Sequence, residues 1–462
     1  MIKLSHLKNC SAVKVQPSLT IEKLAFCTDT RKYQQPSAFV AIPGVKVNPL
    51  DVITDLLNKG CPIVFFQQDE VNDQKVKALK SLFPKVEFTP VTDSVIFLQE
   101  LAHEHIKDWK KINPRNTVFA ISGSNGKTTH KEMLSFILKT IIPGRIVATE
   151  KNNNNHLGVP LTLLGVHDKT EFVVLELGSN HPGEIKVLCD IALPNAGLVT
   201  NIGATHLEFF GTEEHVFEEE GYLYHSIKES TDGKGFFLQN MDDFYLKRFE
   251  KTAGTIRYGE SAEAEAKVVF LDNGAKMNDL TATNDHITGK HNKLNLITCV
   301  YIALKFYPEM KSFILAAAGE FKPTKNRSEW IKFEDRSVFL DAYNANPSSM
   351  KAALQGFKES VETQGHKLSE TCVVLVDMNE LGDSTPEYHQ DVAKYIAQLG
   401  FPNVYFIGRY ADHYLKGFPA GQMRGSSADF KQEYRRNLLK KYSIHFIKGS
   451  RSLQLESLFD IT

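Results

Sequence analysis

A short stretch near residue 125 has the residue types of a loop that binds phosphate. It reads Gly123-Ser124-Asn125-Gly126-Lys127-Thr128-Thr129. Glycines let the backbone turn sharply and expose N–H groups to an anion, and a helix that follows adds the positive end of its dipole. Lys127 would reach the outer phosphates, and the Thr128 hydroxyl is a hard oxygen ligand of the kind that Mg²⁺ prefers. The stretch therefore predicts a site for a phosphorylated ligand with Mg²⁺.

The sequence on either side favours this interpretation. Residues 117–120 form an apolar run typical of a strand, and the apolar residues of 131–138 recur at helical spacing. Ile121 stands where the pattern G-x-x-x-x-G-K-[ST] has its first glycine, so the loop matches the shorter form G-x-x-G-K-T-T. A turn that contains Gly-Lys-Thr by chance is the less favoured alternative.

Two further polar residues lie at the ends of predicted strands. Glu176 falls within the apolar run 172–177, where a carboxylate is costly unless it is paired or binds a cation. His206 follows the apolar run 197–200. Ligands of parallel sheets bind beyond the carboxyl ends of the strands, so we expect both side chains near the phosphate loop. A structural histidine at 206 remains an open alternative.

Amide side chains offer further binding groups. Asn153 and Asn155 belong to a short tract between a strand and an apolar helix, and they could hold substrate or nucleotide oxygens, although low complexity is an alternative. Asn292 begins another apolar helix, either as a cap or as an amide that reads a base. Thr30 and Arg31 lie in a polar cluster for which a solvated loop is the simpler interpretation.

The elements that must position these residues alternate between strand and helix. Continuous apolar runs between helical segments indicate an α/β protein with mostly parallel sheets that are covered on both faces. We expect three domains, at residues 1–90, 91–325 and 326–462, and a helix over 50–59 in the first. The third domain repeats the strand and helix signals on a smaller scale.

Composition excludes several classes of protein. The 462 residues carry 54 Lys and Arg against 55 Asp and Glu, and the net charge of −1 gives no electrostatic case for nucleic acid. Six cysteines lack C-x-x-C spacing, which argues against a disulfide framework or a zinc site. No segment is long and apolar enough for membrane insertion. We expect a cytoplasmic monomer.

Four motifs, together and in order, resemble the Mur ligase family, the ATP-dependent ligases that add amino acids to the cell-wall precursor. They are residues 123–129, residues 176–185, Thr200-Asn201-Ile202-Gly203 with His206-Leu207-Glu208, and residues 341–350, which read Asp-Ala-Tyr-Asn-Ala-Asn-Pro-Ser-Ser-Met. Residues 153–164, 378–382 and 448–452 add to the likeness. Within the family, the chain is most similar to members that join D-alanyl-D-alanine to a UDP-N-acetylmuramoyl tripeptide.

The resemblance implies a fold, ligands and residue roles. The fold is an N-terminal α/β domain for the UDP-sugar, a central P-loop sheet and a C-terminal Rossmann-like domain. ATP would be bound by Gly123, Ser124, Asn125, Gly126, Lys127, Thr128, Thr129, Asn292, Arg327 and Asp341. Mg²⁺ would be held by Thr128, Glu176 and His206, and the catalytic residues would be Lys127, Glu176, His206 and Glu220. The UDP-muramoyl peptide and the dipeptide would contact Thr30, Arg31, Asn153, Asn155, Asn344 and Asn346.

Three positions depart from the family pattern. Glu220 stands where the family usually carries a lysine as its carbamate, and it is either a functional substitute or a plain surface acid. Residues 47–51, Val-Asn-Pro-Leu-Asp, replace a turn that helps to seat the uridine nucleotide. Val376 precedes Asp377 where glycine is usual, which could tighten the pocket for the incoming amine.

These departures keep two other hypotheses open. One is a divergent member of the family that ligates a different acceptor or amino acid. The other is a catalytically impaired pseudo-ligase that binds nucleotide as a scaffold or regulator. A general P-loop ATPase or kinase is less favoured, because it would not explain residues 341–350.

Overall fold

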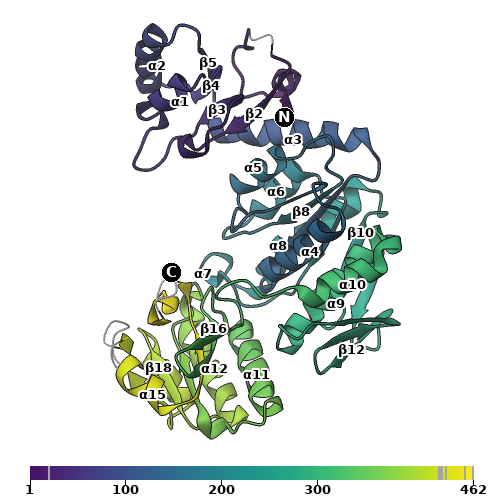
Figure 1. Ribbon diagram of the computed structural model, residues 1–462, viewed down its shortest axis with the longest axis vertical. Helices are drawn as coiled ribbons and strands as arrows, with labels where there is room; N and C mark the ends of the chain where they lie inside the picture. Colours follow the sequence, from purple (N-terminus) through teal and green to yellow (C-terminus); the bar gives the residue numbers. More distant parts are fainter. Residues whose placement is uncertain (19–20, 425–429, 432–433, 452–453, 460–462) are drawn as a thin grey trace.

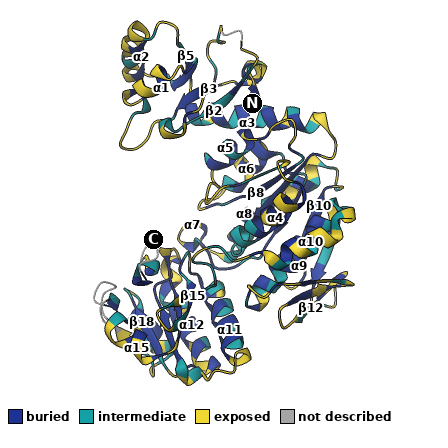
Figure 2. Cartoon of the chain, viewed as in Figure 1, coloured by how far each residue is buried: buried dark blue, intermediate teal, exposed yellow. Residues whose placement is uncertain are grey.

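The computed structural model describes the chain except for residues 19–20, 425–429, 432–433, 452–453 and 460–462. Three sheets follow one another along the long axis of the molecule, and each forms the centre of one lobe (Figure 1). The central strands of each sheet are buried, whereas the outer faces of the helices are exposed (Figure 2). The predicted α/β class is confirmed. The domain boundaries that the sequence suggests stay predictions.

The first sheet has five strands in the order β1-β2-β3-β4-β5, and only the β1–β2 pair is antiparallel. The strands are β1 (Ile2–Lys3), β2 (Lys23–Cys27), β3 (Ser37–Ala41), β4 (Ile63–Gln67) and β5 (Glu87–Val91). The helices are α1 (Thr54–Asn58) and α2 (Glu70–Leu82). The helix expected over 50–59 is shorter than predicted, because Asn48 caps a separate 3₁₀ turn at Pro49–Asp51.

The second sheet has nine strands in the order β14-β13-β12-β11-β10-β9-β6-β8-β7. Its parallel part is β6 (Thr117–Ser122), β7 (Ile146–Ala148), β8 (Phe172–Glu176), β9 (Ala196–Val199), β10 (Phe236–Asn240), β11 (Thr255–Gly259) and β12 (Ala266–Leu271). Antiparallel strands β13 (Gly274–Met277) and β14 (Leu280–Thr283) extend it, an addition that the sequence analysis did not foresee.

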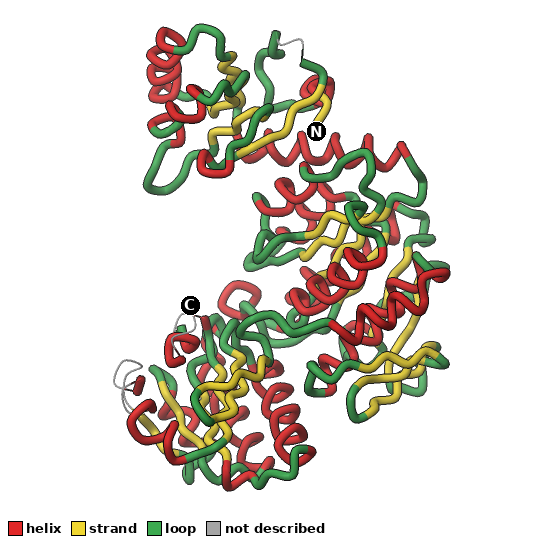
Figure 3. The backbone as a smooth tube through the Cα atoms, viewed as in Figure 1, coloured by secondary structure: helices red, strands yellow, loops and turns green. Residues whose placement is uncertain are grey.

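Two groups of helices cover the parallel strands of this sheet, one on each face (Figure 3). One face packs on α3 (Ser94–Ile112), α5 (Gly158–Leu164), α6 (Glu184–Ala192) and α8 (Glu213–Ser230). The other packs on α4 (Lys127–Ile141), α9 (Lys290–Phe306) and α10 (Lys311–Glu320). The strands bury both faces, which explains their continuous apolar runs. Short helix α7 (Leu207–Phe210) follows β9.

The third sheet has six strands in the order β15-β16-β20-β17-β18-β19, with only β15 antiparallel to its neighbour. The strands are β15 (Glu329–Phe333), β16 (Arg336–Asp341), β17 (Thr371–Leu375), β18 (Val404–Ile407), β19 (Gln422–Arg424) and β20 (Ile444–Lys448). Its helices are α11 (Pro347–Thr363), α12 (Thr385–Leu399), α13 (Ala411–Gly417) and α15 (Leu439–Lys441). Within the described residues, no helix has the length and apolar character of a membrane span.

Candidate active site

A cavity of about 670 Å³ lies between the second and third lobes. The phosphate loop, the carboxyl end of β8 and the loop after β9 line it from one side, and residues from the third lobe line it from the other. The lining residues predicted for ATP or Mg²⁺ are Ser124, Asn125, Gly126, Lys127, Thr128, Thr129, Glu176, His206, Asn292, Arg327 and Asp341. The structure therefore brings most of the predicted nucleotide site together.

The phosphate loop joins β6 to α4 and depends on its two glycines. Gly123 has φ +116°, and a Cβ atom there would lie 2.3 Å from Thr200 Oγ1. Gly126, with φ +85°, precedes the first residue of α4. Glycine adopts such positive φ angles without strain, whereas residues with a side chain do not. Asn201 fixes the loop by accepting from Asn125 N at 3.2 Å and donating to Asn125 O at 2.9 Å.

Glu176 ends β8 beside the first turn of α4. Its Oε1 accepts hydrogen bonds from Thr128 Oγ1 and from Asn154 Nδ2, both at 2.9 Å. Its Oε2 is buried and accepts no hydrogen bond from the described residues. An orphaned carboxylate oxygen next to a hydroxyl is a suitable donor set for Mg²⁺, which takes one or two protein ligands and completes its shell with phosphates and water. The described residues contain no group of three or more acids, histidines or cysteines that could hold a metal without such a substrate.

Glu220 points from α8 to the start of the phosphate loop. Its side chain is 3% exposed, Oε2 accepts from Gly123 N at 2.7 Å, and Oε1 lies 3.6 Å from Lys127 Nζ. The Lys127 ammonium also donates to Gly123 O. The alternative that Glu220 is a surface acid is therefore wrong, because the carboxylate is buried against the loop and its lysine. Its part in the reaction stays a prediction.

His206 lies at the start of α7 with φ +51° and lines the cavity. Its Nδ1 is 2.6 Å from Oε2 of Glu380, which comes from the third lobe. Contact with the imidazole lowers the pKa of Glu380 below its usual value. Glu380 also has a positive φ, +64°, so two strained residues meet at the junction of the two lobes.

Arg327 and Asn346, which belong to the third lobe, donate hydrogen bonds to side chains of the phosphate loop. Arg327 Nη2 donates to Thr128 Oγ1 at 3.0 Å, and its guanidinium lies 3.9 Å from the ring centroid of Tyr343. Asn346 Nδ2 donates to Asn125 Oδ1 at 2.7 Å. The same guanidinium and amide N–H groups could also donate hydrogen bonds to a bound polyphosphate.

The residues predicted for substrate are less uniformly placed. Asn155 and Asn344 line the cavity, although Asn155 Oδ1 also accepts from Gly158 N, at the first residue of α5, at 2.9 Å. Asn153 does not line it. Thr30 and Arg31 lie in the first lobe, away from the cavity lining. Arg31 forms an ion pair of 2.8 Å with Asp29, which lowers the Asp29 pKa to about 2.

Several residues at the site were not singled out for it in the sequence analysis. They are Asn154, Asn201, Tyr343, Ser348, Glu380 and Lys448. All six lie within the segments that carry the family resemblance, so motif membership was the available signal. The contact of Glu380 across the lobe boundary is not revealed by any local pattern.

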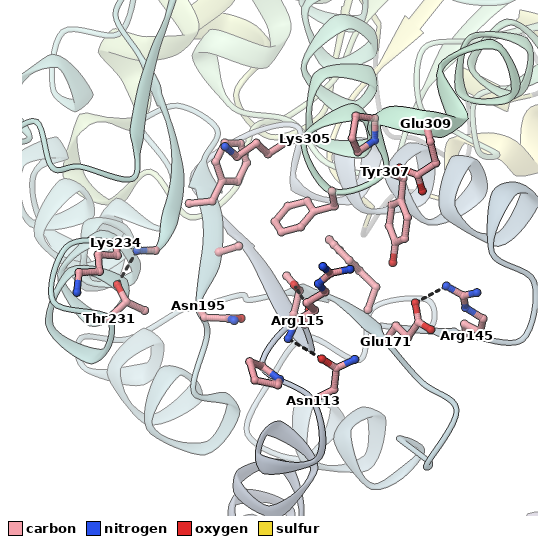
Figure 4. Close-up of a pocket in the computed structure, with 18 residues that line it drawn as sticks. Asn113, Arg115, Arg145, Glu171, Asn195, Thr231, Lys234, Lys305, Tyr307 and Glu309 are labelled. Carbon is pink, nitrogen blue, oxygen red and sulfur yellow. Dashed lines mark hydrogen bonds and ion pairs between the residues drawn. The ribbon is translucent and has the colours of Figure 1, made fainter.

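A second cavity, of about 780 Å³, lies at the opposite edge of the central sheet, where β6, β8, β9 and β10 begin (Figure 4). Four cations line it: Arg115, Arg145, Lys234 and Lys305. Lys305 lies in the last turn of α9, whose carbonyl end attracts positive charge, and Arg145 forms an ion pair with Glu171. Ligands of parallel sheets bind at the other edge.

Comparison with known proteins agrees with the geometry of the first cavity. Residues 121–303 match the Mur ligase middle domain, and residues 326–439 match the Mur ligase, glutamate ligase domain. The UDP-N-acetylmuramoyl-tripeptide–D-alanyl-D-alanine ligase of Bacillus subtilis is 30% identical over 444 residues, which cover 93% of this chain and 91% of that protein. The chain belongs to the Mur ligase family. A ligase of the same name from Escherichia coli is 27% identical to this Mur ligase and covers 94% of it, with 92% of its own length matched.

Solved structures show that this Mur ligase has the three-domain fold expected from the sequence. A MurF crystal structure from Acinetobacter baumannii has a TM-score of 0.80 at 24% identity, with 99% of this chain and 98% of that chain covered. The MurF ligase from Thermotoga maritima in complex with ADP has a TM-score of 0.74 at 22% identity, with 95% and 96% covered.

Proposed function

We propose that this Mur ligase joins D-alanyl-D-alanine to a UDP-N-acetylmuramoyl tripeptide and converts ATP to ADP and phosphate, a step of peptidoglycan precursor synthesis. The observation that carries the proposal is the match with ligases of that activity along nearly the whole chain. The convergence of Lys127, Thr128 and Glu176 at one end of the sheet supports the same chemistry.

The reaction proceeds through two displacements. The terminal carboxylate of the tripeptide attacks the γ-phosphorus of ATP, so that a P–O bond to ADP breaks and an acyl phosphate forms. The amine of the dipeptide then attacks the acyl carbon, phosphate leaves, and the amine loses a proton as the amide forms. Lys127 and the N–H groups in the first turn of α4 stabilise the transferring phosphoryl group. Arg327 contributes a second cation from the third lobe.

Mg²⁺ would be held by Thr128 and Glu176, together with His206, which lines the same cavity. The metal would neutralise the charge that accumulates on the phosphates. Asn292 and Asp341 are assigned to adenine and ribose, and Gly123 to Thr129 to the phosphates. Asn153, Asn155, Asn344 and Asn346 are assigned to the substrate side. Docking of the third lobe would exclude water that hydrolyses the acyl phosphate.

Glu220 is assigned to the position of the anion that the family usually supplies as a carbamylated lysine. The buried carboxylate holds the Gly123 N–H and faces Lys127, so it can orient the lysine without CO₂. A pseudo-ligase is therefore not the favoured alternative, because the charge at this position is retained.

The first lobe favours a second candidate, a ligase of the same chemistry with a different acceptor. In the turn that departs from the family, Asn48 accepts from Leu50 N at 3.0 Å and donates to Asn72 Oδ1 at 2.7 Å. Its amide is thus occupied within the protein rather than free for uridine. Thr30 and Arg31 stay assigned to the nucleotide end of the substrate.

The deciding experiment measures ADP and phosphate release by the purified protein with ATP, Mg²⁺, UDP-muramoyl tripeptide and D-alanyl-D-alanine, and omits each component in turn. We expect release only with all four, together with a UDP-muramoyl pentapeptide by mass spectrometry. Turnover with another acceptor or amino acid would establish the second candidate. ATP binding without turnover on any acceptor would establish the pseudo-ligase. Cytoplasmic location, a monomeric state and the absence of nucleic-acid partners remain predictions.

A further inference from the structure

Strand β20 occupies the middle of the third sheet, between β16 and β17. Its last residue, Lys448, is in register with Asp341 on one side and with Leu375 on the other. The loops that follow β16 and β17 therefore flank the end of β20. Two residues later, Ser450 Oγ accepts from Asn379 N at 3.1 Å, so residues after β20 brace the neighbouring loop. The proposed function gives Lys448 and Ser450 no role.

Lys448 is a buried cation with two acceptors. Its side chain is 2% exposed, and its ammonium donates to Asp341 Oδ2 at 2.7 Å and to Asn344 O at 3.0 Å. A buried ammonium is costly unless it is paired and hydrogen-bonded, and hydrogen bonds between charged groups are short and strong. Lys448 therefore fixes both ends of the segment from Asp341 to Asn344.

This segment faces the nucleotide cavity. Asp341, Tyr343 and Asn344 all line it. The guanidinium of Arg327 lies over the Tyr343 ring and donates a hydrogen bond to Thr128 in the phosphate loop. A shift of the segment would change the orientation of the Asp341 carboxylate and the support of Arg327 together.

We propose that Lys448 is a positioning residue for recognition of the nucleotide ribose. By holding Oδ2 of Asp341, it keeps the carboxylate in one orientation, in which Oδ1 accepts a hydrogen bond from a ribose hydroxyl. The inference rests on the proposed function, because it takes ATP as the ligand and Asp341 as the ribose contact.

The test compares the equilibrium binding of ADP, 2′-deoxy-ADP and 3′-deoxy-ADP by calorimetry. The proteins are the wild type, Lys448→Met, Asp341→Ala and the double variant, with Lys440→Met as a matched control. Lys440 is an exposed lysine in the same lobe, so its loss makes the same chemical change away from the cavity. The measured quantity is the affinity ratio of ADP to the poorer deoxy analogue. A general loss of stability would lower all affinities without changing this ratio.

We expect the wild type and Lys440→Met to prefer ADP by roughly tenfold, the worth of one hydrogen bond to a charged group. Lys448→Met and Asp341→Ala should each bring the ratio close to one, and the double variant should lose no more than Asp341→Ala alone, because both changes act on one contact. The double variant also removes both charges of the pair, which guards against misfolding of Lys448→Met. An unchanged ratio in Lys448→Met, or additive losses, would refute the proposal. A wild type that ligates but does not discriminate between the riboses would refute the Asp341 contact and the inference while leaving the ligase function intact.

Discussion

At the scale of single residues, the phosphate loop is held by groups that lie outside it. Glu220 and Asn201 bond to its backbone, and Glu176 bonds to its threonine. Such bonds fix the shape of the loop and the positions of its charges before a ligand arrives, and preorganisation is a main source of electrostatic stabilisation in enzymes.

Substitution of Glu220 tests this arrangement directly. Glu220→Gln keeps the shape and the acceptor for Gly123 N but removes the charge 3.6 Å from Lys127. We expect kcat to fall roughly tenfold to a hundredfold, since hydrogen bonds to charged groups contribute about 1.5–3 kcal/mol. Steady-state ADP release measures this change. Wild-type activity should not depend on bicarbonate, whereas Glu220→Lys should require it, and bicarbonate dependence of the wild type would contradict the assigned role.

Gly123 offers a stability test of the same loop. An alanine there would combine φ +116° with a Cβ atom 2.3 Å from Thr200 Oγ1. We expect Gly123→Ala to lower the free energy of unfolding by roughly 3 kcal/mol or more, from backbone strain and from the clash. Gly144→Ala is the matched control, because Gly144 has φ +74° but no atom within 4 Å of the added Cβ. Its cost should be about 1 kcal/mol. Equal effects in urea denaturation would show that the contact with Thr200 is unimportant.

At the scale of elements, helix α11 couples its own start to the phosphate loop. Asn346 forms a capping box with Ser349, and its amide also donates to Asn125. One side chain therefore stabilises the helix end and connects two lobes.

Two substitutions separate these roles. Asn346→Asp retains a good helix cap but cannot donate to Asn125, so we expect stability within about 0.5 kcal/mol of wild type and a raised KM for ATP. Asn346→Ala should lose both and cost about 1 kcal/mol. Thermal unfolding and initial rates measure the two effects. If Asn346→Asp leaves the KM for ATP unchanged, the contact with Asn125 does not contribute to nucleotide binding.

The elements that position the site could be predicted where they are local. The strand before residue 123 and the helix after residue 126 follow from apolar spacing, and Glu176 stands out because a buried strand seldom carries a carboxylate. The burial of Glu220 could not be predicted, because an acidic run on a helix normally faces solvent. The contacts of Glu380 and Lys448 depend on how lobes and strands pack, and their partners are more than a hundred residues away in the chain.

At the scale of the whole molecule, buried neutral histidines make stability depend on pH. His389 Nε2 accepts from Met378 N at 3.1 Å, which requires an unprotonated nitrogen, and burial lowers the pKa of His389 to about 4. Burial also lowers the pKa of His445 to about 4. An unfolded histidine takes up its proton near pH 6.5, so the stabilisation is complete above that pH and is lost as the pH falls from about 6.5 towards 4.

We therefore expect the free energy of unfolding to decrease by about 2 kcal/mol for each of these histidines between pH 7 and pH 4.5. Urea denaturation at several pH values measures the slope. His389→Gln should flatten it by about the share of one histidine, and an unchanged slope in that variant would show that folding does not lower the pKa of His389.

The junction of the second and third lobes combines the His206–Glu380 contact with a shared apolar cluster, which includes Leu207 and Phe210 from the second lobe and Met378 and Leu381 from the third. Glu380→Gln removes the charge and leaves the apolar contacts. An ion pair with a half-exposed carboxylate contributes about 1 kcal/mol or less to the docking of the two lobes. We therefore expect the ratio of docked to undocked molecules to change by at most about fivefold. Small-angle scattering without nucleotide measures this change, with Asp383→Asn in the same loop as the control. Complete separation of the lobes in Glu380→Gln would mean that the apolar contacts do not hold them.

Helix α3 has a consequence for which substrates fit. Its 19 residues, about 28 Å at the usual rise, contribute to a single apolar core that includes strands of both the first and the second sheet. The first and second lobes therefore share one hydrophobic core, and they cannot move independently as two domains joined by a linker would. A substrate whose uridine nucleotide is held in the first lobe would then have this end at a fixed distance from the phosphate loop. Each peptide residue extends a substrate by about 3.5 Å, so a precursor that lacks one residue would present its carboxyl group short of the phosphate. The chain would then select its acceptor by length as well as by chemistry.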